Sequence, residues 1–348
     1  MSATGSSNPE YVNGRIRARR AALFSDDEYR KLVRMTPAEI ARYMEESEYE
    51  REINELGSRH SGVDLIEYSL NRNLAKHFND LLGFADGQLY ELIARYLRKF
   101  DAWNVKTVIR GVYTDASREA IETDLIRAGE FDDKLIGRLL DAGTIEDVVT
   151  MLDRTMFGDA LAEAFADFEE TGVLVPLENA VDRAFYEQLL RELPSGEAID
   201  LYREFLEAEI DFRNARNALR LARSGAEIDP SEYFIEGGTL FRAKELNTLV
   251  ENTDQLVDRI RESTYGQELS EPLDELESAE SLIEFERALE SALLRYSRRM
   301  GNVYPLSVTP VVSYILMKER EVENIRAIAR GREAGLSETE IEQELVIL

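Results

Sequence analysis

Apolar residues recur along most of this chain at the three- and four-residue spacing of an amphipathic helix. Between residues 89 and 100 the apolar side chains stand at positions 89, 92, 93, 96, 97 and 100, which places them on one helical face. Alternating apolar and polar runs bounded by turn residues, which indicate half-buried strands, are scarce. The pattern therefore predicts an all-α protein.

Capping signals mark where several of these helices begin. The segment Thr36-Pro37-Ala38-Glu39 combines a capping threonine, a proline at the first helical position and a glutamate that closes a capping box. Ser337 and Glu340 form the same box near the C-terminus. Thr144 and Thr253 follow Thr36 at two nearly equal intervals. We expect a helix to begin at each of these positions.

Three asparagines, Asn104, Asn214 and Asn324, stand at equal intervals along the chain. Each is followed two residues later by a lysine or arginine, and six residues later by an arginine. These basic positions are Lys106 and Arg110, Arg216 and Arg220, and Arg326 and Arg330. A pattern that returns twice at one constant interval indicates internal repetition.

A second marker lies upstream of each asparagine, in a segment that reads apolar-Glu-x-x-apolar. Its glutamates are Glu67, Glu178 and Glu286, at nearly the same interval as the asparagines. Because the markers keep one order and one spacing, the sequence predicts a triplicated unit. We expect a disordered N-terminal tail and three helical repeats, each large enough to bury a core. The predicted boundaries are residues 1–14 for the tail and residues 15–131, 132–240 and 241–348 for the repeats.

The charged anchors allow two interpretations. Equivalent basic residues from three lobes could gather around a common axis and grip a partner. Alternatively, an acidic and a basic anchor could form an ion pair inside each lobe, since charges at apolar-flanked positions are tolerated when they are paired. We favour the second interpretation. The expected pairs are Glu67 with Lys106, Glu178 with Arg216, and Glu286 with Arg326.

The charge balance is strongly acidic, with 69 acidic against 42 basic residues and a formal net charge of −27. Self-repulsion on this scale destabilises a compact state at low ionic strength. At about 1 M salt the Debye length is about 3 Å, and the repulsion is largely screened. The composition thus fits a halophilic protein in a salt-filled cytoplasm, although a protein that wraps a basic partner would share it. Nucleic acid is not an expected partner, because its phosphates bind clustered basic residues.

The usual chemical constellations are missing from the sequence. The chain has no cysteine, and its two histidines, His60 and His77, do not have the spacing of a helical metal site. No glycine-rich phosphate loop is present. We therefore predict no catalytic, cofactor-binding or metal site. We expect Trp103 to lie in the core, and each histidine either to be exposed to solvent or to cap a helix. The N-terminus lacks a signal peptide, and the most apolar stretch, residues 303–317, is too short to span a membrane, so a soluble intracellular protein is expected.

Near the C-terminus the segments Tyr304–Glu319 and Glu323–Gly331 resemble the C-terminal signature of the C subunit of archaeal A-type ATP synthases. That family includes the d subunit of eukaryotic vacuolar ATPases. Its repeated apolar-Glu-x-x-Leu-Asp element is similar to Leu177–Asp182 and to Phe285–Glu290, whereas Asn71 replaces the acid in the first repeat. The resemblance covers nearly the whole chain except the N-terminal tail.

The resemblance implies a funnel of three similar helical lobes with pseudo-threefold symmetry. The funnel would rest on the proton-translocating rotor (proteolipid) ring at the cytoplasmic face of the membrane and would seat the D and F subunits of the central stalk. In this role the chain is a peripheral, non-catalytic coupling subunit without a cofactor, which transmits torque during ATP synthesis and contacts the membrane only through the ring. Two other classes remain open. One is a helical scaffold of another assembly, and the other is an enzyme whose acidic side chains bind a divalent metal.

Overall fold

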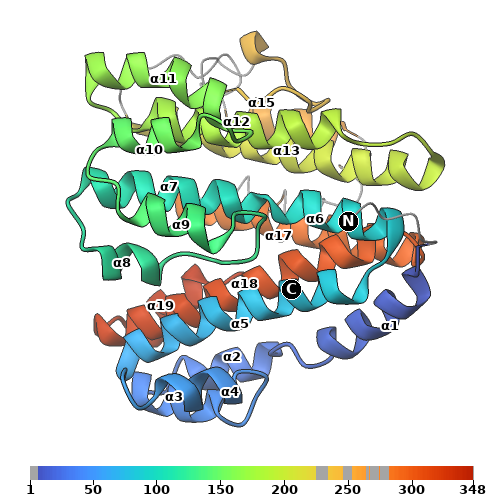
Figure 1. The fold of residues 1–348 in the computed structure, drawn as a ribbon. Helices are drawn as coiled ribbons and strands as arrows, with labels where there is room; N and C mark the ends of the chain where they lie inside the picture. The colour runs from blue at the N-terminus through green and yellow to red at the C-terminus, as the bar shows by residue number, and fades with distance from the viewer. Residues whose placement is uncertain are drawn as a thin grey trace. The chain divides into compact units, whose positions relative to one another are not determined.

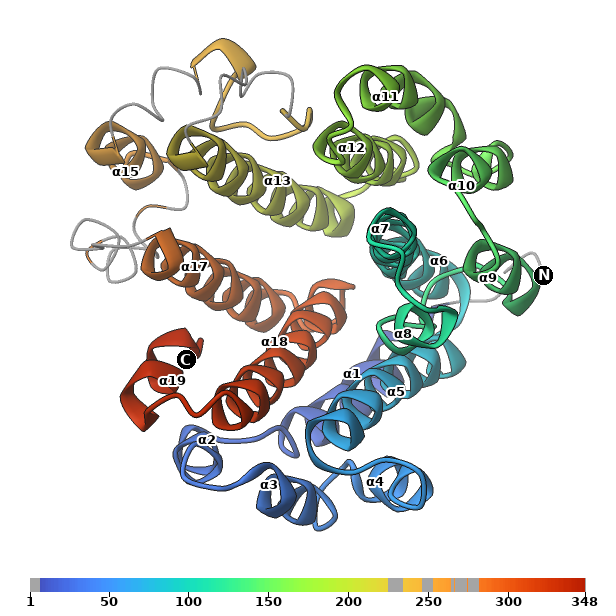
Figure 2. The same cartoon turned by 90° about the vertical axis from the view of Figure 1, so that its left-hand side faces the viewer.

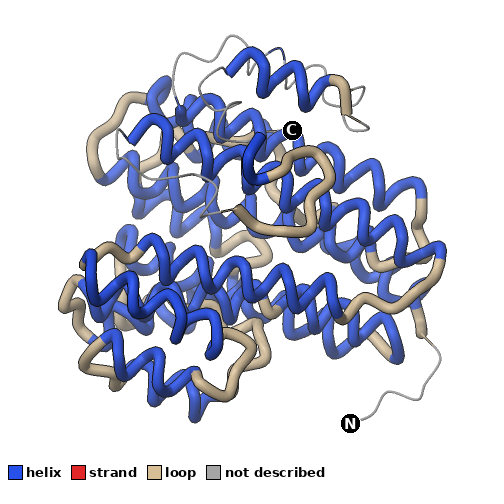
Figure 3. The backbone as a smooth tube through the Cα atoms, turned by 90° about the horizontal axis from the view of Figure 1, so that it is seen from above, coloured by secondary structure: helices blue, strands red, loops and turns tan. Residues whose placement is uncertain are grey.

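The computed structural model describes residues 7–224, 234–245, 253–263, 266, 274 and 282–347. Within these ranges every regular element is an α-helix, and no strand is present (Figures 1 and 3). The predicted all-α class is confirmed. Contacts between residues divide the chain into two compact units, called here unit 1, with residues 71–193, and unit 2, with residues 7–70 and 194–348. The three predicted repeats do not coincide with this division, and they stay a prediction.

Unit 1 is built around two long helices that pack side by side, α7 and α12. Helix α12 also lies along α11, and α10 lies against both α7 and α11. Aromatic pairs fill the interior: Phe78 stacks on Phe100 with ring centroids 5.1 Å apart, and Phe131 meets the edge of Phe157 at 6.0 Å. The helices are α6 (Gly87–Leu97), α7 (Lys99–Tyr113), α8 (Arg118–Thr123), α9 (Asp133–Leu140), α10 (Ile145–Leu152), α11 (Gly158–Thr171) and α12 (Val175–Arg191), and α5 (Gly62–Phe84) enters the unit from residue 71 onward.

Unit 2 is organised around α18, which is flanked by α17, α1, α2, α3 and α19 (Figures 1 and 2). Because neighbours cover α18 on several sides, its first turns are buried all round, from Thr309 to Leu316. Helix α17 also packs on α13. The helices are α1 (Pro9–Arg20), α2 (Asp26–Leu32), α3 (Pro37–Met44), α4 (Glu50–Leu56), the first part of α5, α13 (Glu197–Ser224), α15 (Thr253–Arg261), α17 (Leu282–Val303), α18 (Thr309–Glu333) and α19 (Glu338–Glu344).

The helix starts predicted from capping signals at Thr36, Thr144 and Ser337 are confirmed. Thr36 and Ser337 each accept a hydrogen bond from the backbone N–H three residues later, and each capping box is closed by the expected glutamate. Thr144 caps α10 in the same way, with Asp147 as its partner. Helix α15 is described as Thr253–Arg261, but residues 246–252 lie outside the described ranges, so the start expected at Thr253 stays a prediction. The apolar face between residues 89 and 100 is buried on α6 and at the start of α7, as its periodicity indicates.

Three local expectations were wrong. Trp103 is 39% exposed rather than buried, because it lies on the outward face of α7, where its indole N–H donates to the carbonyl of Asp124 at 3.1 Å. His77 is 3% exposed, so its side chain lies on the buried face of α5 and not at the surface. Helix α1 begins at Pro9, inside the segment expected to be a disordered tail, because Val12 and Ile16 bury one of its faces.

Candidate functional site

The three predicted asparagine anchors make the same contact in three places. Each side-chain amide donates to the backbone carbonyl of a residue 21 or 22 positions later and accepts the backbone N–H of that same residue. Asn104 binds Ile126 in this way at 2.9 and 2.8 Å. The other two clamps are Asn214 with Ile235, at 2.9 and 2.8 Å, and Asn324 with Val346, at 2.9 and 3.1 Å. All three asparagines are at most 2% exposed, so each amide ties a long helix to the returning chain inside the core.

An acidic residue three positions before each asparagine adds a second tie, which the sequence reasoning missed. Asp101 accepts the backbone N–H groups of Glu130 and Phe131 at 2.7 and 3.1 Å. Asp211 accepts those of Thr239 and Leu240, both at 3.0 Å, and Glu321 accepts that of Phe24 at 2.6 Å. The signal was present in the sequence as an acid-x-x-Asn motif that recurs at the interval of the asparagines.

Two glycines let the chain approach these buried carboxylates. A Cβ atom at Gly129 would overlap the carboxylate of Asp101, and one at Gly238 would overlap that of Asp211. Neither glycine has a positive φ that would demand glycine for backbone reasons. Glycine is therefore required at these two positions only because the neighbouring carboxylate leaves no room for a Cβ atom.

We predict that Gly129→Ala lowers the free energy of unfolding by about 1–3 kcal/mol, because the added methyl group must displace a buried, hydrogen-bonded carboxylate. Gly137→Ala on α9 is the matched control, since a Cβ there meets no atom within 4 Å. The control should raise stability by up to about 1 kcal/mol through its higher helix propensity. Urea unfolding followed by circular dichroism measures both changes, and equal effects of the two variants would contradict the close-approach argument.

Burial raises the pKa of both Asp101 and Asp211 to about 6, although the backbone N–H donors oppose the shift. Between about pH 4 and pH 6 the folded chain therefore holds protons that the unfolded chain releases. Each of the two groups therefore contributes more stability at pH 4 than at pH 6. The difference is at most about 3 kcal/mol for each group, since one pKa unit corresponds to about 1.4 kcal/mol.

The pH dependence predicts that the stability advantage of the wild type over Asp211→Asn shrinks as the pH rises from about 4 to 6. The asparagine keeps one acceptor oxygen but cannot titrate, so the difference between the two unfolding curves isolates the carboxyl group. Denaturant titrations at several pH values measure it. A difference that stays constant with pH, or grows, would contradict the raised pKa.

Ion pairs join the long helices within each unit. In unit 1 the Nζ of Lys106 lies 2.7 Å from Asp182, and Arg110 binds both oxygens of Glu178 at 2.5 and 2.9 Å. Both pairs connect α7 to α12. In unit 2 the corresponding contacts are Arg216 with Glu290 at 3.5 Å, between α13 and α17, and Arg330 with Glu67, between α18 and α5.

These partners differ from the pairs expected from the sequence. Glu178 binds Arg110 instead of Arg216, because α12 lies along α7 and the two side chains face each other. Glu67 binds Arg330 instead of Lys106. The third expected pair, Glu286 with Arg326, stays a prediction, and the side chain of Arg220 lies outside the described residues.

Asn71, which replaces the acid of the family's repeated element, has a structural contact of its own. Its amide Nδ2 donates to the carbonyl of Thr123 at 2.9 Å, within unit 1. A carboxylate has no N–H to donate, so an acid at this position could not make the same bond. The substitution therefore fits its surroundings.

Unit 2 also contains a buried cluster of charged and polar groups. Lys318 and Glu321 on α18 are 1% and 2% exposed, with Nζ and Oε1 2.6 Å apart. The hydroxyl of Tyr49 donates to Glu321 at 2.7 Å and accepts from Lys318 at 2.9 Å. Burial lowers the pKa of Lys318 below its ordinary value, while the neighbouring carboxylate opposes that shift. The cluster fastens the N-terminal helices of unit 2 to α18.

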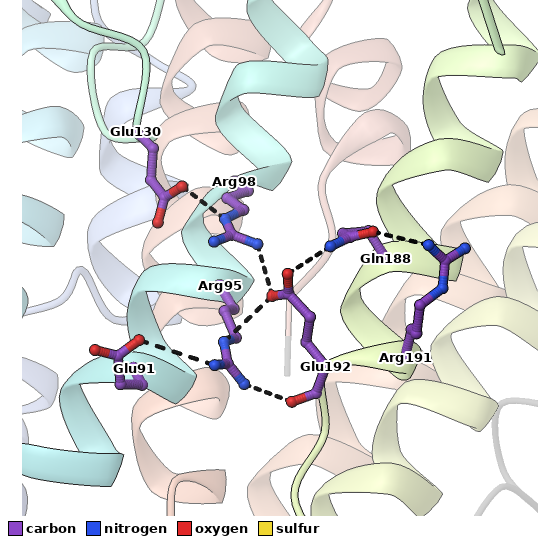
Figure 4. A network of polar contacts seen from close by, with 7 residues as sticks. All are labelled: Glu91, Arg95, Arg98, Glu130, Gln188, Arg191 and Glu192. Atoms are coloured by element: carbon purple, nitrogen blue, oxygen red, sulfur yellow. Dashed lines mark hydrogen bonds and ion pairs between the residues drawn. The ribbon is translucent and has the colours of Figure 1, made fainter. Parts of the chain in front are cut away.

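A larger network joins the end of α12 to α6 and α7 in unit 1 (Figure 4). Glu192 accepts from Arg98 at 2.7 Å and from Gln188 at 2.5 Å, and it lies 3.3 Å from Arg95. Burial raises the pKa of Glu192, but these donors outweigh it, and the pKa lies below its ordinary value. The residues of the network are Glu91, Arg95, Arg98, Glu130, Gln188, Arg191 and Glu192.

A cleft of about 860 Å³ opens beside this network, lined among others by Arg98, Asp101, Glu130, Gln188 and Glu192. These polar groups bind one another or the backbone: Arg98 binds Glu130, Gln188 binds Glu192, and Asp101 binds two backbone N–H groups. These contacts tie the loop between α8 and α9 to the start of α7 and order the end of α12, which is a structural task.

Metal ligands and membrane spans are both missing from the part of the chain that the structure describes. No three or more histidine, aspartate or glutamate side chains are grouped there as ligands of a metal ion. Nor does any helix in those ranges combine the length and the apolar composition that a membrane span requires.

Residues 12–344 match the family model of the ATP synthase (C/AC39) subunit, which covers nearly the whole chain. The chain belongs to this family. Among similar members, the A-type ATP synthase C subunit of Haloferax volcanii is 73% identical over the full length of both chains. The C subunit of Haloquadratum walsbyi is 66% identical over 99% of this chain and 100% of its own. That of Methanosarcina acetivorans is 35% identical over 99% of this chain and 94% of its own.

Membership of the ATP synthase (C/AC39) subunit family confirms the resemblance found in the C-terminal segments of the sequence. The asparagine anchors and the acids that accompany them lie within the matched residues 12–344. Several of the most similar members come from haloarchaea, in agreement with the acidic composition of the chain.

Proposed function

We propose that this chain is a non-catalytic coupling subunit of an archaeal rotary ATP synthase, placed between the membrane rotor ring and the central stalk. The observation that carries the proposal is the clamp that recurs in three places, at Asn104, Asn214 and Asn324. The names of the similar proteins, which are C subunits of A-type ATP synthases, support the same assembly.

Transmission of torque requires a body that deforms little under load. A fully buried two-bond clamp resists sliding of a long helix against the returning chain, because sliding would leave two backbone groups unpaired. The ion pairs between α7 and α12, and between α13 and α17, add resistance between neighbouring long helices. The contacts that recur in this chain are thus suited to stiffness.

In the proposed assembly the three repeats form lobes around a pseudo-threefold axis, as a funnel that receives the D and F subunits of the central stalk. The other end rests on the proteolipid ring, at the cytoplasmic face of the membrane, and the chain is a peripheral subunit. Rotation of the ring driven by protons then turns the stalk through this chain during ATP synthesis. The constant interval between the three asparagines supports three equivalent lobes.

Co-purification tests this proposal. A tagged copy of the full chain, expressed in a haloarchaeal host and extracted from membranes in detergent and about 1 M salt, is expected to bring down the ring and the D and F subunits of the stalk. Membrane vesicles depleted of the chain should lose proton-driven ATP synthesis and regain it when the chain is added back. A different set of partners would indicate a scaffold of another assembly, and turnover of a metabolite by the purified chain would contradict a non-catalytic role.

A further inference from the structure

Three stretches of at least 15 residues in this acidic chain contain no acidic residue, namely residues 11–25, 212–226 and 291–318. The chain carries 69 acids in 348 residues, about one in five, yet residues 11–25 and residues 291–318 have none. Chance spacing at this frequency would place about eight acids in those 43 residues. The same two segments hold seven arginines: Arg15, Arg17, Arg19, Arg20, Arg295, Arg298 and Arg299.

The two segments lie against each other in unit 2. The first forms most of α1 and the second forms the end of α17 and the start of α18, and α1 packs against α18. The amide of Asn13 donates to the carbonyl of Pro305 at 2.6 Å, which ties α1 to the connection between α17 and α18. Burial lowers the pKa of Arg20, and repulsion from the nearby charge of Arg298 lowers it further. The arginines of the two segments thus lie on α1 and on the last turns of α17, within unit 2.

An exposed apolar group stands next to these arginines. Residues 302–306, at the end of α17 and in the loop that follows it, are all exposed, with Val303 at 52%, Tyr304 at 38% and Leu306 at 58%. Tyr11 on α1 is 49% exposed and accepts a hydrogen bond from Arg15 at 3.0 Å. We call the seven arginines together with Tyr11, Val303, Tyr304 and Leu306 the arginine tip.

The spacing of residues along α17 determines how far the arginines of the arginine tip lie from its exposed apolar side chains. Arg299 precedes Val303 by four residues and Arg295 precedes it by eight, which corresponds to about 6 and about 12 Å along the helix axis. A cleft of about 430 Å³ lies among Arg295, Arg298, Arg299, Asn302 and Val303. The exposed apolar side chains thus lie at the end of α17 and just beyond it, and Arg299 and Arg295 lie about one and two turns further back along the helix.

We propose that the arginine tip docks on the surface of an anionic lipid bilayer, with its apolar residues at the acyl boundary and its arginines on headgroup phosphates. Interfacial anchors of proteins enter a bilayer by about 5–10 Å, so Tyr304 and Leu306, just beyond the end of α17, would place Arg299 at the depth of the phosphates. Arginine binds phosphate through a planar fork of donors, a contact that persists when salt screens long-range attraction.

The charge distribution favours contact through the arginine tip. All 69 acids lie outside residues 11–25 and 291–318, so neither of the two segments that form the tip presents a carboxylate of its own to anionic headgroups. The proposal goes beyond the proposed function and differs from the expectation that membrane contact runs only through the ring. Binding to lipid is a property of the chain alone and can be tested without the other subunits.

Vesicle flotation with the purified full chain, in about 1 M KCl, is the test. Vesicles of phosphatidylcholine with phosphatidylglycerol should carry the chain upward, and vesicles of phosphatidylcholine alone should carry at least about fivefold less. Arg298→Glu/Arg299→Glu should lower the partition coefficient on anionic vesicles by at least about fivefold, and Val303→Ser/Leu306→Ser should also lower it. Circular dichroism establishes that each variant is folded.

The matched control is Arg30→Glu/Arg51→Glu, which changes the net charge equally at exposed positions outside the acid-free segments. This variant should float like the wild type. Absence of flotation on anionic vesicles, equal binding to neutral ones, or equal loss in the control would overturn the proposal, and an acidic segment of a partner protein would then be the occupant of the tip. None of these outcomes affects the co-purification result, so the two proposals can fail separately.

Discussion

Replacing Glu321 with alanine is expected to lower the free energy of unfolding by about 3–5 kcal/mol. The change removes the carboxylate that Lys318 contacts at 2.6 Å, and it leaves an ammonium group that is 1% exposed without its counter-charge. It also removes the acceptor of the hydroxyl of Tyr49 and of the backbone N–H of Phe24. Urea unfolding in about 1 M KCl, followed by circular dichroism, measures the loss.

Glu323 offers a matched control two residues further along α18. Its carboxylate is 47% exposed and pairs with Arg320 at 2.9 Å, so Glu323→Ala should cost at most about 1 kcal/mol. The double variant Lys318→Met/Glu321→Met removes both buried charges together and should be more stable than Glu321→Ala alone. If the double variant were the less stable of the two, the loss could not be assigned to an unpaired buried charge.

Replacing Asn324 with alanine is expected to lower the free energy of unfolding by about 2–5 kcal/mol. The substitution leaves the buried backbone N–H and C=O of Val346 without partners, and each unpaired group costs about 1–3 kcal/mol. Asn104→Ala should have a similar effect through Ile126, because the clamp has the same geometry. Denaturant titrations of each variant measure the change.

The control for the clamps is Asn302→Ala, at an exposed position, where a change within about 0.5 kcal/mol is expected. Asn324→Asp is a second comparison, because aspartate keeps an acceptor for the N–H of Val346 but has no N–H for its carbonyl. A loss at Asn324 no larger than at Asn302 would show that the clamp does not stabilise the fold.

The sequence predicted the features that depend on neighbours along the chain. Helical periodicity and the capping boxes at Thr36 and Ser337 act within one turn, and both are observed. The asparagines were recognised because they recur at a fixed interval. Their two-bond contact was not foreseen, since a residue 22 positions away becomes a partner only when the chain turns back.

Contacts between separate helices could not be assigned in the same way. The partner of Glu178 depends on which long helix lies beside α12, and periodicity gives the buried face of a helix but not the identity of its neighbour. Trp103 was expected in the core, although its position on α7 shares the outward face with Arg110. Packing between helices decided both cases.

The bond between Glu321 and the backbone N–H of Phe24 joins positions 297 residues apart. Unit 2 consequently consists of the first helices and the last ones, with unit 1 inserted between them in the sequence. On a ribosome that adds about 5–20 residues per second, α2 and α3 emerge roughly 15–60 s before the helix on which they pack. Unit 1 can fold during that interval, whereas the apolar faces of the first helices remain uncovered until translation is almost finished.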